Sequence, residues 1–144
     1  LNGLSGAVRD TAVERSITRL AMADIADRRS DGFSQGQRMK VGLGRALIHD
    51  PQNFVLDEPT RGLDVMSTRN LRSLLRELRE ERRCILFSSH VMAEVAALCD
   101  VVVIVRDGSL CAAGSPEALC AQAGRSDLEE AFIQLIGTAE GIAA

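Results

Sequence analysis

Aromatic residues and lysine are scarce in this 144-residue chain, which has four Phe, no Trp or Tyr, and Lys40 as its only lysine. Aliphatic packing must therefore form most of the core, and a chain of this size buries about two-thirds of its unfolded surface. The formal net charge of −3 argues against a nucleic-acid partner bound through bulk electrostatics. We expect one domain and no nucleic-acid binding.

Paired cysteines and long apolar runs are also missing. Cys84, Cys99, Cys111 and Cys120 form no C-x-x-C pair and lie in apolar segments, so a zinc site or disulfide framework is not expected. We expect buried, reduced thiols instead. No run approaches the roughly 20 apolar residues that span a bilayer, and no signal-peptide pattern opens the chain. We therefore expect a cytosolic polypeptide.

Hydrophobic spacing predicts several helices. The first begins at Asp10 or Thr11, with Thr11 and Glu14 as a capping box, and its apolar residues reach Ile25. Another carries a leucine stripe at i, i+3, i+4 and i+7 and ends near Arg83. The others are expected at residues 35–48, at 91–99, from Ser115-Pro116, and from a Ser126/Glu129 capping box to a frayed tail at Gly137.

Two short apolar stretches, residues 54–56 and 84–87, read as strands joined by the leucine-striped helix. A helical crossover makes such strands parallel. Residues 101–105 and 110–113 flank an Asp107-Gly108 turn, which predicts a hairpin. The fold class is therefore α/β, with a partial, mostly parallel sheet flanked by helices.

The first strand delivers Asp57 and Glu58 to its carboxyl end, where open α/β sheets bind ligands, although acids also end strands as turn formers. His90 follows the parallel neighbour, and a structural role is the alternative. Upstream, Ser34 and Gln37 make a capping box at a helix start.

That helix start has two readings. Ser34 is a mere cap, or Gly36 leaves backbone N–H groups open to a phosphate. Asp64 likewise has two readings, because it can cap the helix that follows it and can also belong to a functional site.

In order and spacing, Phe33 to Gln37, Asp57-Glu58, Gly62 to Asp64 and Ser88 to His90 resemble the C-terminal half of an ATP-binding cassette (ABC) ATPase: signature motif, Walker B residues, D-loop and switch histidine. Phe33 and Gln35 stand where the common signature has Leu and Gly. The resemblance covers nearly the whole chain and implies ATP and Mg²⁺ as cofactors.

The resemblance also implies roles. Asp57 belongs to the Mg²⁺ shell, Glu58 polarises the attacking water, His90 contacts the γ-phosphate side and Asp64 acts across a dimer interface. Residues that meet a nucleotide held by the opposite subunit are Ser34, Gly36 and Gln37.

The phosphate-binding sequence G-x-x-x-x-G-K-[ST] is absent, and Lys40 lies inside the signature helix. The chain thus resembles the C-terminal part of a nucleotide-binding subunit, with a helical-subdomain remnant and signature helix (1–50), a Walker B, D-loop and switch-histidine core (51–115) and C-terminal helices (116–144). We expect it to be inactive alone, and the whole subunit to hydrolyse ATP as a dimer on the inner membrane face, held by permease subunits.

Three alternatives remain: a DNA-repair ATPase, a translation-factor ATPase, and a non-catalytic interaction module. Within transporters, Gly62 to Met66, Phe87 to His90 and Glu94 to Asp100 resemble the ATPases of bacterial sodium-extrusion-type ABC-2 exporters. The resemblance therefore implies export through separate membrane subunits.

Overall fold

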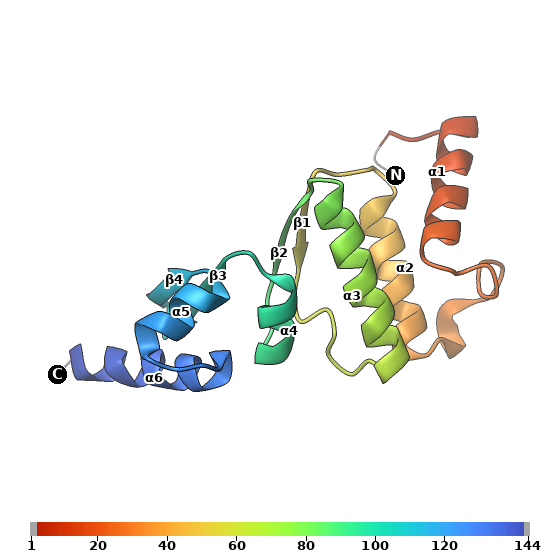
Figure 1. Cartoon of the computed structure of the whole chain (residues 1–144). Coiled ribbons are helices and arrows are strands. Elements are labelled where there is room, and N and C mark those ends of the chain that lie inside the picture. The colour runs from red at the N-terminus through yellow and green to blue at the C-terminus, as the bar shows by residue number, and fades with distance from the viewer. Residues whose placement is uncertain (1–2, 143–144) are drawn as a thin grey trace. The chain divides into compact units, whose positions relative to one another are not determined.

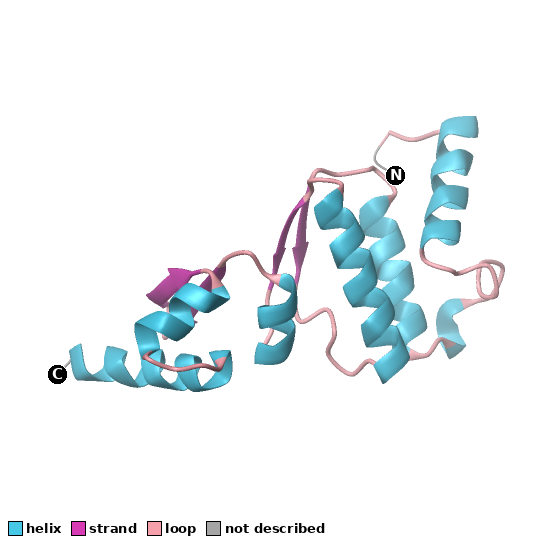
Figure 2. Cartoon of the chain, in the orientation of Figure 1, coloured by secondary structure: helices cyan, strands magenta, loops and turns pink. Residues whose placement is uncertain are grey.

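Helices and short strands alternate along the chain in the computed structural model, which describes residues 3–142 (Figure 1). The described residues divide after Ser88 into two compact units, and each is described by itself. Each unit contains a two-stranded sheet; the strands are magenta in Figure 2. The α/β class is confirmed. The elements of the first unit are α1 (Gly6–Arg19), a 3₁₀ turn (Ser30–Gly32), α2 (Gln35–Leu47), β1 (Asn53–Leu56), α3 (Val65–Glu80) and β2 (Cys84–Phe87).

Helix α1 differs from its sequence prediction at both ends. It begins at Gly6 and ends at Arg19, so the Thr11/Glu14 capping box is wrong. Ala21 has a left-handed backbone with φ +48°, which ends the helical path. Ile25 is nevertheless 3% exposed, beyond the helix. The apolar spacing therefore predicted correctly that Ile25 is buried, but not that it belongs to the helix.

Strands β1 and β2 are parallel, as predicted, and α3 connects them. Phe54 pairs with Ile85 and Leu56 with Phe87. Helix α3 packs against β2, and α1 packs against α2 (Figure 1). The predicted leucine stripe of α3 is buried and includes Leu78 at 1% exposure.

The outer face of this small sheet is apolar and open. Val55 and Leu86 are register partners, and they are 79% and 64% exposed. Phe54, on the other face, is 5% exposed. Because successive side chains of a strand alternate between faces, only one face of β1 and β2 is covered in this unit.

The second unit contains α4 (Met92–Leu98), β3 (Val102–Arg106), β4 (Ser109–Gly114), α5 (Pro116–Ala123) and α6 (Leu128–Ile142). The predicted hairpin is confirmed: β3 and β4 are antiparallel around Asp107 and Gly108, which both have positive φ. Ser115 caps α5, as predicted. The hydrophobic core of the second unit consists of Val95, Ile104, Ala112, Leu119, Leu128 and Leu135.

Three further predictions, two for helix α6 and one for the cysteines, are wrong. Helix α6 continues through Gly137 to Ile142, because one glycine costs a helix only about 1 kcal/mol. Its first amides are bound by the Asp127 carboxylate, which accepts from Glu129 and Glu130 N–H, and not by Ser126. The four cysteines are free thiols as expected, but none is buried and Cys84 is exposed.

Candidate functional site

The carboxyl ends of β1 and β2 bring Asp57, Glu58 and Ser88 together. The Ser88 N–H donates to the Leu56 carbonyl at 3.0 Å and so extends the parallel pairing by one step. The Ser88 hydroxyl donates to Asp57 Oδ1 at 2.6 Å and accepts the Glu58 N–H at 2.8 Å. One hydroxyl therefore holds both predicted acidic residues at the edge of the sheet.

Glu58 has an unusual backbone. Its φ of +45° lies in the left-handed region, which residues other than glycine rarely occupy. The turn that follows is closed by the Arg61 N–H donating to the Glu58 carbonyl at 3.0 Å. Such strain concentrates at functional sites, where surrounding contacts maintain it. The bond to Ser88 is one such contact.

Asp64 ends the loop after this turn and caps α3, as predicted. Its carboxylate accepts from Ser67 N–H at 2.9 Å and from Ser67 Oγ at 2.7 Å. The backbone hydrogen bond from Ser67 is the main cause that lowers the pKa of Asp64, and the hydroxyl adds to it. Asp64 is exposed, so its carboxylate remains open to solvent.

The capping box at the start of α2 is confirmed. Gln37 N–H donates to Ser34 Oγ at 3.2 Å, and Ser34 N–H donates to Gln37 Oε1 at 3.0 Å. Gly36 is buried, and a Cβ built on it would lie 2.5 Å from Ser67 Oγ. Gly36 therefore faces α3, whereas the only role predicted for it was to leave backbone N–H groups open to a phosphate.

His90 and Lys40 are the two remaining residues that the sequence singled out. His90 belongs to the second unit, in the exposed bend before α4. Lys40 lies on α2, and its ammonium group donates to the Ala21 carbonyl at 3.0 Å. This contact gives the lone lysine a structural role next to the end of α1.

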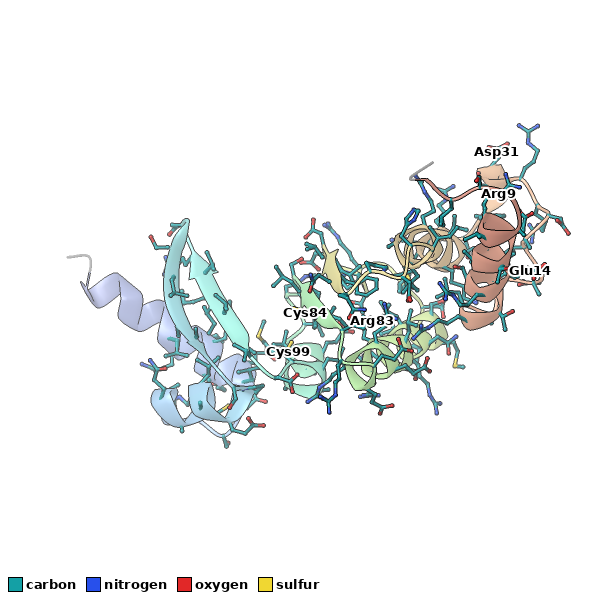
Figure 3. All side chains as sticks on the ribbon, turned by 90° about the horizontal axis from the view of Figure 1, so that it is seen from above. Arg9, Glu14, Asp31, Arg83, Cys84 and Cys99 are labelled. Carbon is teal, nitrogen blue, oxygen red and sulfur yellow. The ribbon has the colours of Figure 1, made fainter. Side chains whose placement is uncertain are left out.

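The opposite, amino ends of the strands are joined by Arg83, which is labelled in Figure 3. Its guanidinium donates to the Pro51 carbonyl and to the Asp50 carboxylate, both at 2.6 Å, and to Glu81 at 3.1 Å. Glu81 in turn binds Arg19 at 2.7 Å. These contacts lower the pKa of Asp50, mainly through Arg83, and that of Glu81, mainly through Arg19. They fix where the strands that carry the acidic residues begin.

Sequence reasoning missed Ser88 as a site residue and the contacts of Gln35. Ser88 was open to inference, because a polar residue directly after β2 must lie opposite Asp57 once Leu56 pairs with Phe87. The Gln35 amide donates to the Arg61 carbonyl at 2.8 Å, a pair 26 positions apart. No local pattern indicates it.

Comparison of the chain with known proteins shows the family to which it belongs. Residues 5–61 match the family model described as ABC transporter. The chain is 41% identical over 133 residues to the ABC transporter ATP-binding protein NatA of Bacillus subtilis (strain 168), a match that covers 92% of this chain and 54% of NatA. This chain belongs to the ABC transporter ATP-binding family.

Two further comparisons agree with that membership. The linearmycin resistance ATP-binding protein LnrL of Bacillus subtilis (strain 168) is 30% identical over 142 residues, covering 91% of this chain and 46% of LnrL. A solved structure titled "Structure of ATP binding subunit of ABC transporter" matches with a TM-score of 0.78 and 27% identity, covering 93% of this chain and 57% of that one. The chain spans about half the length of the curated relatives it matches. These matches favour a transport ATPase over the repair, translation and interaction-module alternatives.

The ABC family implies a nucleotide, and the acidic edge fits the Mg²⁺ that accompanies nucleotides. Mg²⁺ usually keeps several waters and takes one or two carboxylates together with substrate phosphates. Asp57 is an exposed carboxylate of this kind, with Glu58 next to it. Within the residues that the structure describes, no three His, Cys, Asp or Glu side chains gather to form a metal-binding group. A single carboxylate completed by water and phosphate is the fitting ligand set.

None of the helices in the described part of the chain combines the length and apolar character that a membrane crossing requires.

Proposed function

We propose that this chain is the C-terminal part of an ATP-hydrolysing subunit that drives transport through separate membrane subunits. The observation that carries the proposal is the acidic edge, where the Ser88 hydroxyl holds Asp57 and Glu58 at the ends of two parallel strands. Open α/β sheets bind ligands at this edge. The 41% identity to an ABC transporter ATP-binding protein supports ATP as the substrate at this edge.

Hydrolysis of ATP needs phosphate charge to be neutralised and a water molecule to be oriented. Asp57 would hold Mg²⁺, which neutralises phosphate charge when bound. Glu58 accepts a proton from, or orients, the attacking water. Asp57 is kept in place by its 2.6 Å bond from Ser88, and Glu58 is held at the same hydroxyl through its backbone N–H. The place of Glu58 directly after the carboxylate proposed for Mg²⁺ supports Glu58 as the hydrolytic residue.

The remaining proposed roles lie at a dimer interface. Ser34, Gly36 and Gln37 would meet the nucleotide of a second nucleotide-binding subunit, Asp64 would act across the same interface, and His90 would contact the γ-phosphate side. The exposed Asp64 carboxylate and the exposed Ser34 at the positive end of α2 support these assignments. Permease subunits would hold the assembly at the inner membrane face and select the cargo, and the ABC-2 resemblance supports export.

The longer subunit is needed for this activity. The 144 residues contain no G-x-x-x-x-G-K-[ST] sequence, and Lys40 is bound to Ala21. The exposed pair Val55 and Leu86 supports a further segment of the subunit covering that side of the sheet. We expect the chain alone neither to hydrolyse ATP nor to bind it tightly.

Substitution of Glu58 tests the proposal in the whole subunit assembled with its permease. Glu58→Gln should leave ATP binding intact and reduce turnover by about a hundredfold or more, within the range of general-base catalysis. Glu77→Gln, which makes the same change on the exposed face of α3, is the matched control and should keep wild-type turnover. Undiminished turnover of Glu58→Gln would exclude Glu58 as the hydrolytic residue.

A further inference from the structure

Gln35 joins the start of α2 to the loop of residues 60–64. Its Nε2 donates to the Arg61 carbonyl at 2.8 Å. The next residue, Gly62, has φ +70°, and a Cβ built there would lie 2.5 Å from Gln35 Nε2 and 2.7 Å from Oε1. The Gln35 amide therefore lies directly over the α-carbon of Gly62, and the absence of a side chain at Gly62 makes this approach possible.

Gly36 makes a second contact between the same two segments. A Cβ on Gly36 would lie 2.5 Å from Ser67 Oγ and 3.3 Å from Ser67 Cβ. Ser67 Oγ cannot move away freely, because it donates to Asp64 Oδ2 at 2.7 Å. Two consecutive residues at the start of α2 thus contact the other segment. Gln35 contacts the loop of residues 60–64, and Gly36 contacts the first turn of α3.

We propose that Gln35 is a positioning residue that locks the 60–64 loop to the start of α2, so that Ser34 and Asp64 move as one body. We name this contact the α2–loop joint, formed by Gln35, Gly36, Gly62 and Ser67. It rests on the proposed function, in which both Ser34 and Asp64 face a partner subunit. A nucleotide that shifts one of them then shifts the other by the same amount.

The joint has a simpler rival explanation, in which Gln35 merely packs on an exposed surface and Gly36 is small only to admit phosphate. The two explanations require different properties of the side chains. The joint needs the donor group of the Gln35 amide and the limited space at Ser67 Oγ. Surface packing needs neither, so isosteric substitutions separate the two.

Gln35→Glu keeps the size of the side chain and removes the N–H that donates to Arg61. Gln122→Glu, at an exposed glutamine of α5, is the matched control for the change in charge. In the intact subunit, hydrogen exchange of the amides of Arg61 and Leu63 should become about two- to tenfold faster in Gln35→Glu, as expected for the loss of one neutral hydrogen bond. The control should leave their exchange unchanged. Equal exchange in the two variants would overturn the joint.

Turnover provides the functional readout. Gln35→Glu should lower the kcat of the assembled transporter by a similar factor while the KM for ATP stays within about twofold, because the joint acts through Asp64 and not through the subunit's own nucleotide. A rise in KM at constant kcat would contradict a positioning role. Exchange does not depend on activity, so an inactive wild-type assembly would refute the proposed function and still leave the joint to be judged.

Gly36→Ala tests the steric half of the joint. The added Cβ should reduce kcat, and Ser67→Ala in the same subunit should restore at least half of the loss, because it removes the atom at 2.5 Å and leaves the one at 3.3 Å. Ser67→Ala alone measures the cost of losing its bond to Asp64. If the double variant is no better than Gly36→Ala, glycine is needed for another reason and the steric contact is overturned.

Discussion

Replacing Ser88 by Ala is the sharpest test of how the acidic edge is built. The change removes one oxygen atom, and with it the donor to Asp57 Oδ1 at 2.6 Å and the acceptor of the Glu58 N–H at 2.8 Å. Both carboxylate-bearing residues remain in the chain. A loss of activity then measures positioning alone.

The expected size follows from these two bonds. A hydrogen bond to a charged group contributes about 1.5–3 kcal/mol and a neutral one about 0.5–1.5 kcal/mol. Asp57 and Ser88 are exposed, so water competes and the lower ends apply, which together give about 2 kcal/mol. If all of it is lost from the transition state, kcat falls about 30-fold. Glu58 also loses a contact that holds its backbone at φ +45°.

The assay is steady-state ATP hydrolysis by the intact subunit with its permease, with kcat and KM determined separately. Ser88→Thr keeps the hydroxyl and should restore most of the activity. Ser73→Ala, on the exposed face of α3, removes a hydroxyl of the same size and should have no effect. A kcat for Ser88→Ala within about twofold of wild type would refute the view that this hydroxyl positions the acidic residues.

Two further predictions concern stability and are measured by urea denaturation of the intact subunit. Leu78→Ala removes a side chain that is 1% exposed and should cost about 3 kcal/mol, whereas Met66→Ala, 60% exposed on the same helix, should cost less than about 0.5 kcal/mol. Asp64 has a lowered pKa in the folded state, so its contribution is present above its unfolded pKa of about 3.9 and is lost as the pH falls through the folded value. Wild type should therefore lose stability more steeply than Asp64→Asn between about pH 5 and 3, and parallel curves would contradict the assignment.

Much of the candidate site could be predicted because its pieces are local. The Ser34/Gln37 capping box and the Asp64 cap join residues three positions apart, so the sequence alone brings the partners together. The helical crossover between two apolar stretches predicted the parallel pairing of β1 and β2. That pairing placed Asp57 and Glu58 at the carboxyl edge of the sheet.

Local patterns failed to predict the end of α1, because apolar residues at helical spacing can be buried outside a helix. Ile25 continues the apolar spacing of α1 and is buried, yet the helix has already ended at Arg19. A backbone turn at Ala21 carries the chain back so that Ile25 still reaches the interior. Periodicity reports which side chains avoid water, and several backbone paths satisfy that condition.

Only the tertiary structure decided the contacts between distant segments. Ser88 and Asp57 are 31 positions apart, Gln35 and Arg61 are 26 apart, and Arg19 and Glu81 are 62 apart. A glutamine, a serine or an arginine is compatible with many exposed positions, so its residue type does not name its partner. The sequence by itself determined which residues are candidates for the chemistry and at which strand ends they stand. The packing of α2, α3 and the two strands determined what holds them there, because a hydrogen bond needs its two atoms within about 3 Å and only the folded chain brings such distant residues that close.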